Sequence, residues 1–309
     1  MSAFSGPAGN VRAVARSVLE SVVNRPFKPR DRILRATSLD GAAFVADPRF
    51  RLTHPAHGRD HMTYSCCEDE HGRLWARASL FDAGQWSTEI TDGRRWHSVA
   101  PLGLRHLMSP SWSGARLYGI GIDVDDVSRP VCFARGASGW PDREVAQHFE
   151  TAAGGLGPQD LWVVASPGGQ TAFGTITAPR GSSVHRWIST DRATWAYAGE
   201  AVQAQNDDAF LSDPCVVRTP DGWRMFLRAG RTPVLGARIR SAVASDPAAW
   251  RLEDGDRISP GGRWASHGVG FPFARVDEAG WELYYTGFWG ACRASQDVAR
   301  RWSLAEAVS

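Results

Sequence analysis

Short runs of alternating apolar and polar residues recur along this chain, and many are joined in pairs by a turn sequence. The clearest pair spans residues 213–228, where two runs of strand-forming residues flank the turn Thr219-Pro220-Asp221-Gly222. A Pro-Asp-Gly turn favours a tight hairpin, because proline presets φ and glycine accepts a positive φ. Residues 268–276 and 281–288 repeat this arrangement around a second turn that ends in glycine. The pattern predicts antiparallel β-meanders.

Three earlier stretches show the same pairing of apolar runs across a turn. They are residues 61–80, 106–122 and 161–177. Together with the two C-terminal pairs, they predict five successive sheets.

Each predicted sheet is followed by a tryptophan that closes a short phrase. These residues are Trp96, Trp140, Trp195, Trp250 and Trp302, and four of them follow a Ser or Thr and an Asp by a few residues. The polar side chains are suited to bond the backbone of a turn, and the indole is suited to pack between neighbouring sheets. A repeat of about 50 residues with internal strand signals is typical of radial β architectures. We therefore predict a five-bladed β-propeller over residues 36–309.

The first 35 residues follow a helical pattern instead. Apolar residues lie on one face of a predicted helix of about 15 residues that ends before Pro26; they are Val11, Val14, Val18, Leu19 and Val22. Basic residues outnumber acidic ones seven to two in this segment. We expect residues 1–35 to form a basic α-helical arm. Its charged face is either solvent-exposed beside the propeller or a docking surface for an acidic partner, such as a carrier protein that presents the substrate.

Composition narrows the functional classes. The formal net charge of the 309 residues is only +2, so we expect no nucleic-acid partner. No apolar run is long enough to span a bilayer, and no secretory leader is evident. The 5 cysteines form no disulfide or metal pattern, and reduced, buried thiols suit a cytoplasmic location. We predict no cofactor and no bound metal.

Candidate functional residues lie where the innermost strands of the predicted propeller begin, since these ends converge at one mouth of the central channel. Acidic and imidazole side chains occur there in every predicted blade. Because Asp and His are costly to bury unless they are paired, their convergence indicates a site. The positions, in blade order, are Arg59, Asp60 and His61; His106 and Ser109; Asp160; Asp207, Asp208 and Asp213; and Ser266 and His267.

The stretch Leu211-Ser-Asp-Pro-Cys-Val-Val-Arg-Thr-Pro-Asp-Gly-Trp-Arg-Met-Phe-Leu227 resembles the blade openings of the five-bladed glycosidases, which include arabinanases, β-xylosidases, invertases and levansucrases. The Ser-x-Asp-x-x-x-Trp phrases resemble theirs as well, and Ser266-His-Gly-Val-Gly-Phe-Pro272 is similar to their last-blade segment with a channel histidine. The resemblance covers roughly residues 50–309. It implies catalysis by an Asp base or nucleophile, an orienting Asp and a Glu general acid.

Carried over residue by residue, the resemblance matches Asp213 to an Asp-Pro position and places Asp60 as the first-blade Asp. No glutamate begins a predicted inner strand, and Asp160 stands where we look for the acid. We predict Asp213 as the base; its alternative role is to cap the turn before its strand. The predicted catalytic residues are Asp60, His61, Asp160, Asp213 and His267. The predicted substrate-binding residues are His106, Ser109, Trp112, Asp208, Arg228 and Trp264, with Trp112 or Trp264 as an apolar wall.

Three functions fit these residues. The first is an enzyme of specialised metabolism that uses an Asp or His base for cyclisation or elimination on a small polar substrate, which needs no glutamic acid when the leaving group is activated. The second is an intracellular glycoside hydrolase that uses Asp carboxylates. The third is a non-catalytic propeller that binds a sugar or a protein. The missing glutamate puts the first ahead of the second, and the converging Asp and His residues argue against the third.

Overall fold

The computed structural model describes residues 31–288 except 56–60, 83–84, 126, 153–154, 179–180, 206–207, 233–234 and 263. The predicted N-terminal helix, Arg59, Asp60, Asp207 and the last tryptophan phrase lie outside the described residues. Within them, the secondary structure is β-strand apart from one 3-10 turn, η1 (Ala100–Leu102). The prediction of an all-β fold is confirmed for the described residues.

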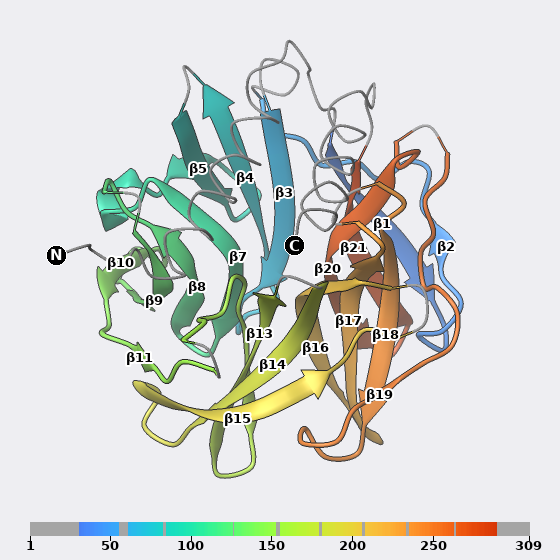
Figure 1. Cartoon of the computed structure of the whole chain (residues 1–309). Helices are drawn as coiled ribbons and strands as arrows, with labels where there is room; N and C mark the ends of the chain where they lie inside the picture. Colours follow the sequence, from blue (N-terminus) through green and yellow to red (C-terminus); the bar gives the residue numbers. More distant parts are fainter. Residues whose placement is uncertain are drawn as a thin grey trace, which may run out of the picture.

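The described strands form four sheets, which follow the chain as antiparallel meanders (Figure 1). The first sheet contains β3 (His61–Glu68), β4 (Leu74–Asp82), β5 (Gln85–Thr91) and β6 (Trp96–Ser98). The second contains β7 (His106–Ser113), β8 (Arg116–Ile122), β9 (Ser128–Arg135) and β10 (Pro141–Glu144).

The third sheet has nine strands and consists of two meanders. One contains β12 (Trp162–Ser166), β13 (Gly169–Ala178), β14 (Gly181–Ser189) and β15 (Thr194–Val202), with β11 (His148–Phe149) parallel to β15. The other contains β16 (Phe210–Thr219), β17 (Gly222–Gly230), β18 (Arg238–Ala244) and β19 (Arg251–Leu252). A single parallel residue pair, Ser182 with Phe210, joins them.

The fourth sheet joins the two ends of the described chain. It contains β20 (Gly268–Asp277), β21 (Gly280–Phe288), β1 (Arg32–Ser38) and β2 (Val45–Ala46). Strand β1 pairs with β21 along its whole length, from Arg32 opposite Gly287 to Ser38 opposite Trp281. The predicted boundary between residues 35 and 36 therefore falls inside β1, and residues 32–35 belong to this sheet.

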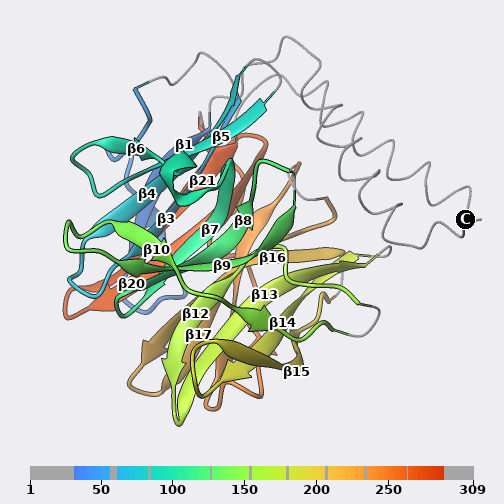
Figure 2. The ribbon, with the colours of Figure 1, turned by 90° about the vertical axis from the view of Figure 1, so that its left-hand side faces the viewer.

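The first strand of each meander lies at the centre of the molecule. Strands β3, β7, β12, β16 and β20 contact one another in cyclic order, so that β20 also contacts β3. Figure 1 shows β3, β7, β16 and β20 near the middle, with β5, β10, β15, β19 and β2 toward the rim. Figure 2 views the same meanders from the side of β6, β9 and β10. This is the radial arrangement expected of a propeller.

Tryptophans of the polar phrases pack between consecutive meanders. The Trp195 side chain is completely buried, and its ring stacks on Phe149 at 5.0 Å and meets Tyr118 of the preceding meander at 5.9 Å. Trp140 meets Trp75 at 4.8 Å in the same way. Half-buried Trp250 lies 5.5 Å from Phe173. The interpretation of these phrases as inter-sheet packing units therefore holds for Trp140 and Trp195, and in part for Trp250, which is only half-buried.

The polar residues of the phrases form the turns. Asp191 accepts hydrogen bonds on Oδ1 from the backbone N–H groups of Ala193 and Thr194, and from the Ser189 hydroxyl. These bonds hold the pKa of Asp191 well below its usual range. The turn also contains Arg192, a non-glycine residue with φ of 62°.

Two composition-based expectations concern thiols and membranes. Cys66, Cys67, Cys132 and Cys215 are free and buried, and burial raises the pKa of the Cys215 thiol to about 12. A helix long and apolar enough to cross a membrane does not occur among the described residues.

Candidate functional site

Three inner strands carry the same irregularity at the same position. The pairing register shifts after Met108 in β7, after Ser212 in β16 and after Gly270 in β20. The next residues, Ser109, Asp213 and Phe271, have φ of 46°, 54° and 49°. Each is the fourth residue of its strand and precedes a proline. Proline cannot donate a ladder hydrogen bond, and a β-bulge leaves one residue unpaired, so the X-Pro pair fits a bulge.

The Asp213 side chain is held at one oxygen. Its Oδ2 atom lies 2.9 Å from Nε of Arg228 and accepts a 3.3 Å hydrogen bond from the backbone N–H of Phe271. Its Oδ1 atom has no hydrogen-bond partner among the described residues, and 8% of the side chain is exposed. Asp213 is thus anchored by one oxygen, while the other has no partner among the described residues.

Asp160 supports Asp213 from the neighbouring meander. Its Oδ1 accepts a hydrogen bond from the Thr175 backbone N–H at 2.6 Å, and its Oδ2 accepts bonds from the Thr175 hydroxyl at 2.6 Å and the Asp213 N–H at 2.8 Å. Both oxygens are therefore engaged within the protein. The carboxylate orients the bulge that carries Asp213.

Burial raises the pKa of both carboxyls. For Asp160, burial followed by the nearby Asp213 charge raises the pKa to about 6, against the opposing hydrogen bonds from Thr175. For Asp213, burial raises the pKa although Arg228, the Phe271 N–H and Arg77 favour the charged form. Two acids that share one buried region cannot ionise independently, so the pair holds a proton more readily than isolated acids do.

Arg77 connects the bulges. Its side chain is buried, and it donates hydrogen bonds to the Ser65 hydroxyl at 3.0 Å and to the Leu107 carbonyl at 3.2 Å. Its guanidinium lies 5.6 Å from the centre of the Phe271 ring. Burial lowers the pKa of Arg77 to about 10, an effect that Asp213 opposes, so the group stays charged near neutral pH.

Arg228 repeats this arrangement in another meander. Arg77 is paired across the strands with Ser65, and Arg228 is paired with Ser212. Arg228 Nε donates to the Ser212 hydroxyl at 2.9 Å, and its guanidinium lies 5.0 Å from the Phe271 ring. The two arginines thus reach the same aromatic ring beside Asp213, and the predicted site residue Arg228 lies with Asp160 and Asp213.

Other predicted site residues lie between the sheets. The Nδ1 atom of His106 is 2.6 Å from the Thr88 hydroxyl, and burial, reinforced by Arg77 and Arg105, lowers the pKa of His106 to about 3. This histidine is therefore neutral near pH 7. Trp112 is buried against Trp75 at 5.2 Å between the first and second sheets. The aromatic ring beside Asp213 is Phe271 instead.

The remaining predicted residues have separate surroundings. Asp208 pairs with Arg238 at 2.8 Å and Arg240 at 3.0 Å, both on β18. The Arg32 guanidinium stacks 3.6 Å from the Trp264 ring. Half-buried His267 has Nδ1 3.1 Å from the Ser266 hydroxyl. His61 is the first residue of β3.

Phe271 and Arg77 were absent from the residues predicted to form the site. A signal for Phe271 existed in the sequence, because Ser109-Pro110, Asp213-Pro214 and Phe271-Pro272 occupy equivalent places in three predicted inner strands. Arg77 lies in a second strand and had no such signal, since its approach to the centre depends on sheet packing.

The described residues also bear on metal binding. They contain no group of three His, Cys, Asp or Glu side chains placed to hold a metal ion. Both oxygens of Asp160 accept protein hydrogen bonds, which makes this carboxylate a poor candidate ligand.

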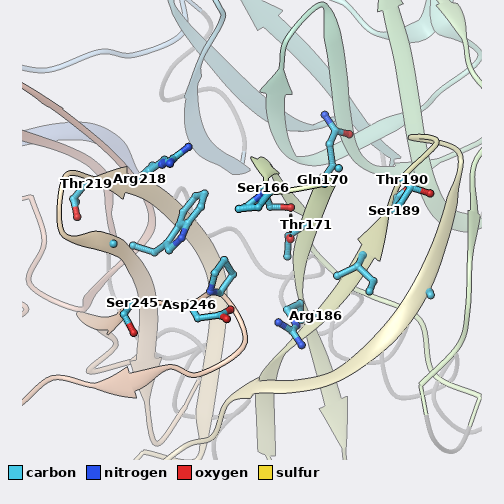
Figure 3. Close-up of a pocket in the computed structure, with 18 of the residues that line it drawn as sticks. Ser166, Gln170, Thr171, Arg186, Ser189, Thr190, Arg218, Thr219, Ser245 and Asp246 are labelled. Atoms are coloured by element: carbon cyan, nitrogen blue, oxygen red, sulfur yellow. Dashed lines mark hydrogen bonds between the residues drawn. The ribbon is translucent and has the colours of Figure 1, made fainter.

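A groove of about 920 Å³ lies elsewhere, between the turns of the two meanders of the nine-stranded sheet (Figure 3). The β12–β13 turn and the Thr219–Gly222 turn line it, at the end of β16 opposite to Asp213. Its residues Asp191 and Asp246 bond the backbone of their own turns. Arg186 and Arg218 also line it. The groove is thus separate from the carboxylate pair.

The two acids make stability depend on pH. Because the pKa of Asp160 is raised above its unfolded value, the folded state binds more protons between pH 4 and 6, and the free energy of unfolding falls as pH rises through that range. We expect this contribution to fall by roughly 1–3 kcal/mol. Urea unfolding between pH 4 and 7 measures it. In Asp213→Asn, where the neighbouring charge is gone, the decline should be smaller; identical pH profiles would contradict the coupling.

Comparisons with known proteins concern the fold. No protein-family model and no curated protein sequence matches this chain. One similar structure belongs to GH130, a family of mannoside phosphorylases that contains glycoside hydrolases acting on β-1,2 mannosidic linkages. It is 12% identical over 74% of this chain and 83% of that chain, with a TM-score of 0.52. The GH32 β-fructofuranosidase of Bombyx mori is 9% identical over 90% of this chain and 62% of that one, also with a TM-score of 0.52.

A family 117 glycoside hydrolase of Zobellia galactanivorans is 17% identical, but its TM-score is 0.39 and the match spans about half of each chain, 45% of this one and 51% of that one. These neighbours belong to the five-bladed β-propeller glycosidase clan. At such low identity the likeness concerns the fold, and it agrees with the resemblance of the blade openings.

Proposed function

We propose that this protein is a glycoside hydrolase with a five-bladed β-propeller. The observation that carries the proposal is the state of Asp213, a buried carboxyl with a raised pKa, one oxygen anchored and the other without a protein partner in the described chain. In place of the base that the sequence predicted, a buried carboxyl with a raised pKa suits a general acid, which donates a proton to the glycosidic oxygen as the bond breaks.

The blade count rests on the central strands. Strands β3, β7, β12, β16 and β20 each begin an antiparallel meander, and their cyclic contacts support one blade for each. In this arrangement β1 and β2 complete the blade that β20 and β21 begin, which ties the N-terminal part of the described chain to the C-terminal part.

The other roles follow from the surroundings of each residue. Asp160 acts as a positioning residue, because its two oxygens hold Thr175 and the Asp213 N–H. The positive charges of Arg228 and Arg77 favour the ionised form of Asp213 and so oppose the rise in its pKa. Hydrolysis needs a second carboxyl, to act as nucleophile or to activate water. By the resemblance that residue is Asp60, which precedes the inner strand β3.

Hydrolysis is a better proposal than the cyclisation or elimination that the sequence alone favoured. The missing glutamate was the reason for preferring the latter. The raised pKa of Asp213 supplies an acid without a glutamate, and the fold neighbours support a glycosidase.

A screen of defined glycosides tests the proposal. Wild-type protein is incubated with 4-nitrophenyl α-L-arabinofuranoside, 4-nitrophenyl β-D-xylopyranoside, 4-nitrophenyl β-D-mannopyranoside and sucrose, and release of nitrophenol or glucose is measured. We expect turnover of at least one substrate, with Asp213→Asn protein as the control for contaminating hydrolases. Absence of turnover on all four, or equal turnover by the variant, counts against the proposal.

A further inference from the structure

The bulges at Ser109, Asp213 and Phe271 are not required by the fold. Strand β3 occupies the same central position as β7, β16 and β20, yet it pairs with β4 in continuous register from His61 to Glu68. An inner strand of this molecule can therefore be regular. The irregular strands need another explanation.

The bulges also carry a conformational cost. A positive φ is unfavourable for residues with a side chain beyond glycine, and such strain persists mainly where the surroundings impose it, often at functional sites. Among the described residues, the non-glycine residues with positive φ are Ser109, Arg192, Asp213 and Phe271. Arg192 lies in the exposed turn before Trp195, and the other three lie in central strands.

The three bulges are linked by direct contacts. The Phe271 N–H donates to Asp213 Oδ2, which joins the bulges of β20 and β16. Arg77 donates to the carbonyl of Leu107, two residues before Ser109, and lies over the Phe271 ring, which joins the bulges of β7 and β20. The three bulged residues, Ser109, Asp213 and Phe271, are here called the bulge triad; a hydrogen bond joins Phe271 to Asp213, and Arg77 links the strand of Ser109, at Leu107, to the Phe271 ring.

The three residues of the bulge triad offer three different kinds of contact to a ligand. The Ser109 side chain is half-buried, and its hydroxyl has no hydrogen-bond partner within the described chain. Half-buried Phe271 offers an aromatic ring that two guanidinium groups hold in place. Asp213 offers a carboxylate oxygen that no described residue engages. A hydroxyl, an aromatic face and a carboxylate together match a sugar ring, which has hydroxyl groups around its edge and apolar C–H groups on its faces.

We propose that Ser109 and Phe271 are substrate-contacting residues that determine specificity, and that the bulge triad forms a subsite for one sugar ring. This inference rests on the proposed glycosidase function and extends it to the residues that select the substrate. The Phe271 ring packs against a C–H face of the sugar, and the Ser109 hydroxyl bonds a sugar hydroxyl.

Two matched glycine variants separate function from strain. Glycine adopts positive φ without steric cost, so Ser109→Gly and Arg192→Gly should both fold, each with a melting temperature equal to or up to about 2 °C above wild type. A third variant, Phe271→Leu, keeps an apolar side chain but removes the aromatic face. Circular dichroism confirms that each variant is folded.

The probes are arabinose, xylose, mannose and fructose, added singly at high concentration during thermal unfolding. We expect at least one sugar to raise the melting temperature of wild type and of Arg192→Gly equally. The same sugar should give little or no rise in Ser109→Gly and Phe271→Leu, in line with an apparent Kd weakened about tenfold. On a hydrolysed glycoside, KM should rise about tenfold in these two variants with a smaller change in kcat.

The outcomes separate the two proposals. If wild type hydrolyses none of the glycosides but the sugar shift is lost only in the two triad variants, the sugar subsite stands and the hydrolase proposal fails. If hydrolysis occurs and KM is unchanged in both triad variants, the hydrolase stands and the subsite is overturned. A sugar shift that is absent from wild type, or equal in all four proteins, also overturns the subsite.

Discussion

Asp213→Asn is expected to lower kcat by roughly 10²–10⁴ while leaving the melting temperature nearly unchanged. Asparagine has almost the same shape as aspartate, and its carbonyl oxygen can still lie beside Arg228 and accept from the Phe271 N–H. Its NH₂ group then takes the place of Oδ1, which has no protein partner among the described residues. What the variant loses is the ability to exchange a proton.

The measurement is steady-state turnover on the glycoside found in the screen, together with thermal unfolding of the same preparation. Asp208→Asn is the matched control, because Asp208 is an equally buried carboxylate just before the same strand, and it pairs with Arg238 and Arg240. This control should lose stability and keep its turnover. A folded Asp213→Asn protein with turnover near wild type would mean that Asp213 only shapes the bulge.

Trp195→Ala is expected to reduce the free energy of unfolding by about 3–5 kcal/mol. The indole is completely buried, stacks on Phe149 and meets Tyr118 of the preceding meander. Its Nε1 also donates a hydrogen bond of 2.7 Å to the Gln147 side chain. Truncation leaves a cavity between two sheets, and it leaves the Gln147 side-chain oxygen without the indole N–H that it accepts from. Both effects destabilise the folded state.

Urea unfolding measures this loss, and Trp250→Ala provides the comparison. Trp250 closes the equivalent phrase, but it is only half-buried, and among the described residues its aromatic neighbour is Phe173. Its replacement should therefore cost less, about 1–3 kcal/mol. A loss below about 1 kcal/mol for Trp195→Ala would show that the tryptophan phrases do not hold the sheets together.

The sequence was sufficient for the features that depend on neighbouring residues. Alternating apolar positions and the turn Thr219-Pro-Asp-Gly222 predicted the hairpin of β16 and β17, which the structure contains. The polar phrase before Trp195 predicted both a turn bonded by Asp191 and a buried indole. Such features can be read from sequence because side-chain alternation and turn geometry arise within a few residues of the chain.

The sequence was less informative about the ends of the molecule. Residues 32–35 looked like the end of a basic arm, yet they form half of a strand that pairs with β21. Their pairing partner lies more than two hundred residues away. Alternation over so few residues does not specify which distant edge a strand joins, so the closing of the last sheet was decided by tertiary structure.

Some residues of the candidate site could also be found from the sequence, and others were placed only by the tertiary structure. The Ser-Asp-Pro phrase identified Asp213, and the start of the third inner strand identified Asp160. The direction of the other side chains depended on the bulges. A bulge inserts one residue and exchanges the two faces of the strand beyond it. The placement of Trp112 between sheets, and of Phe271 beside Asp213, therefore depended on register shifts that alternation alone did not predict. Arg77 reached the same place from a second strand, since only the packing of one sheet against the next brings its guanidinium to Phe271.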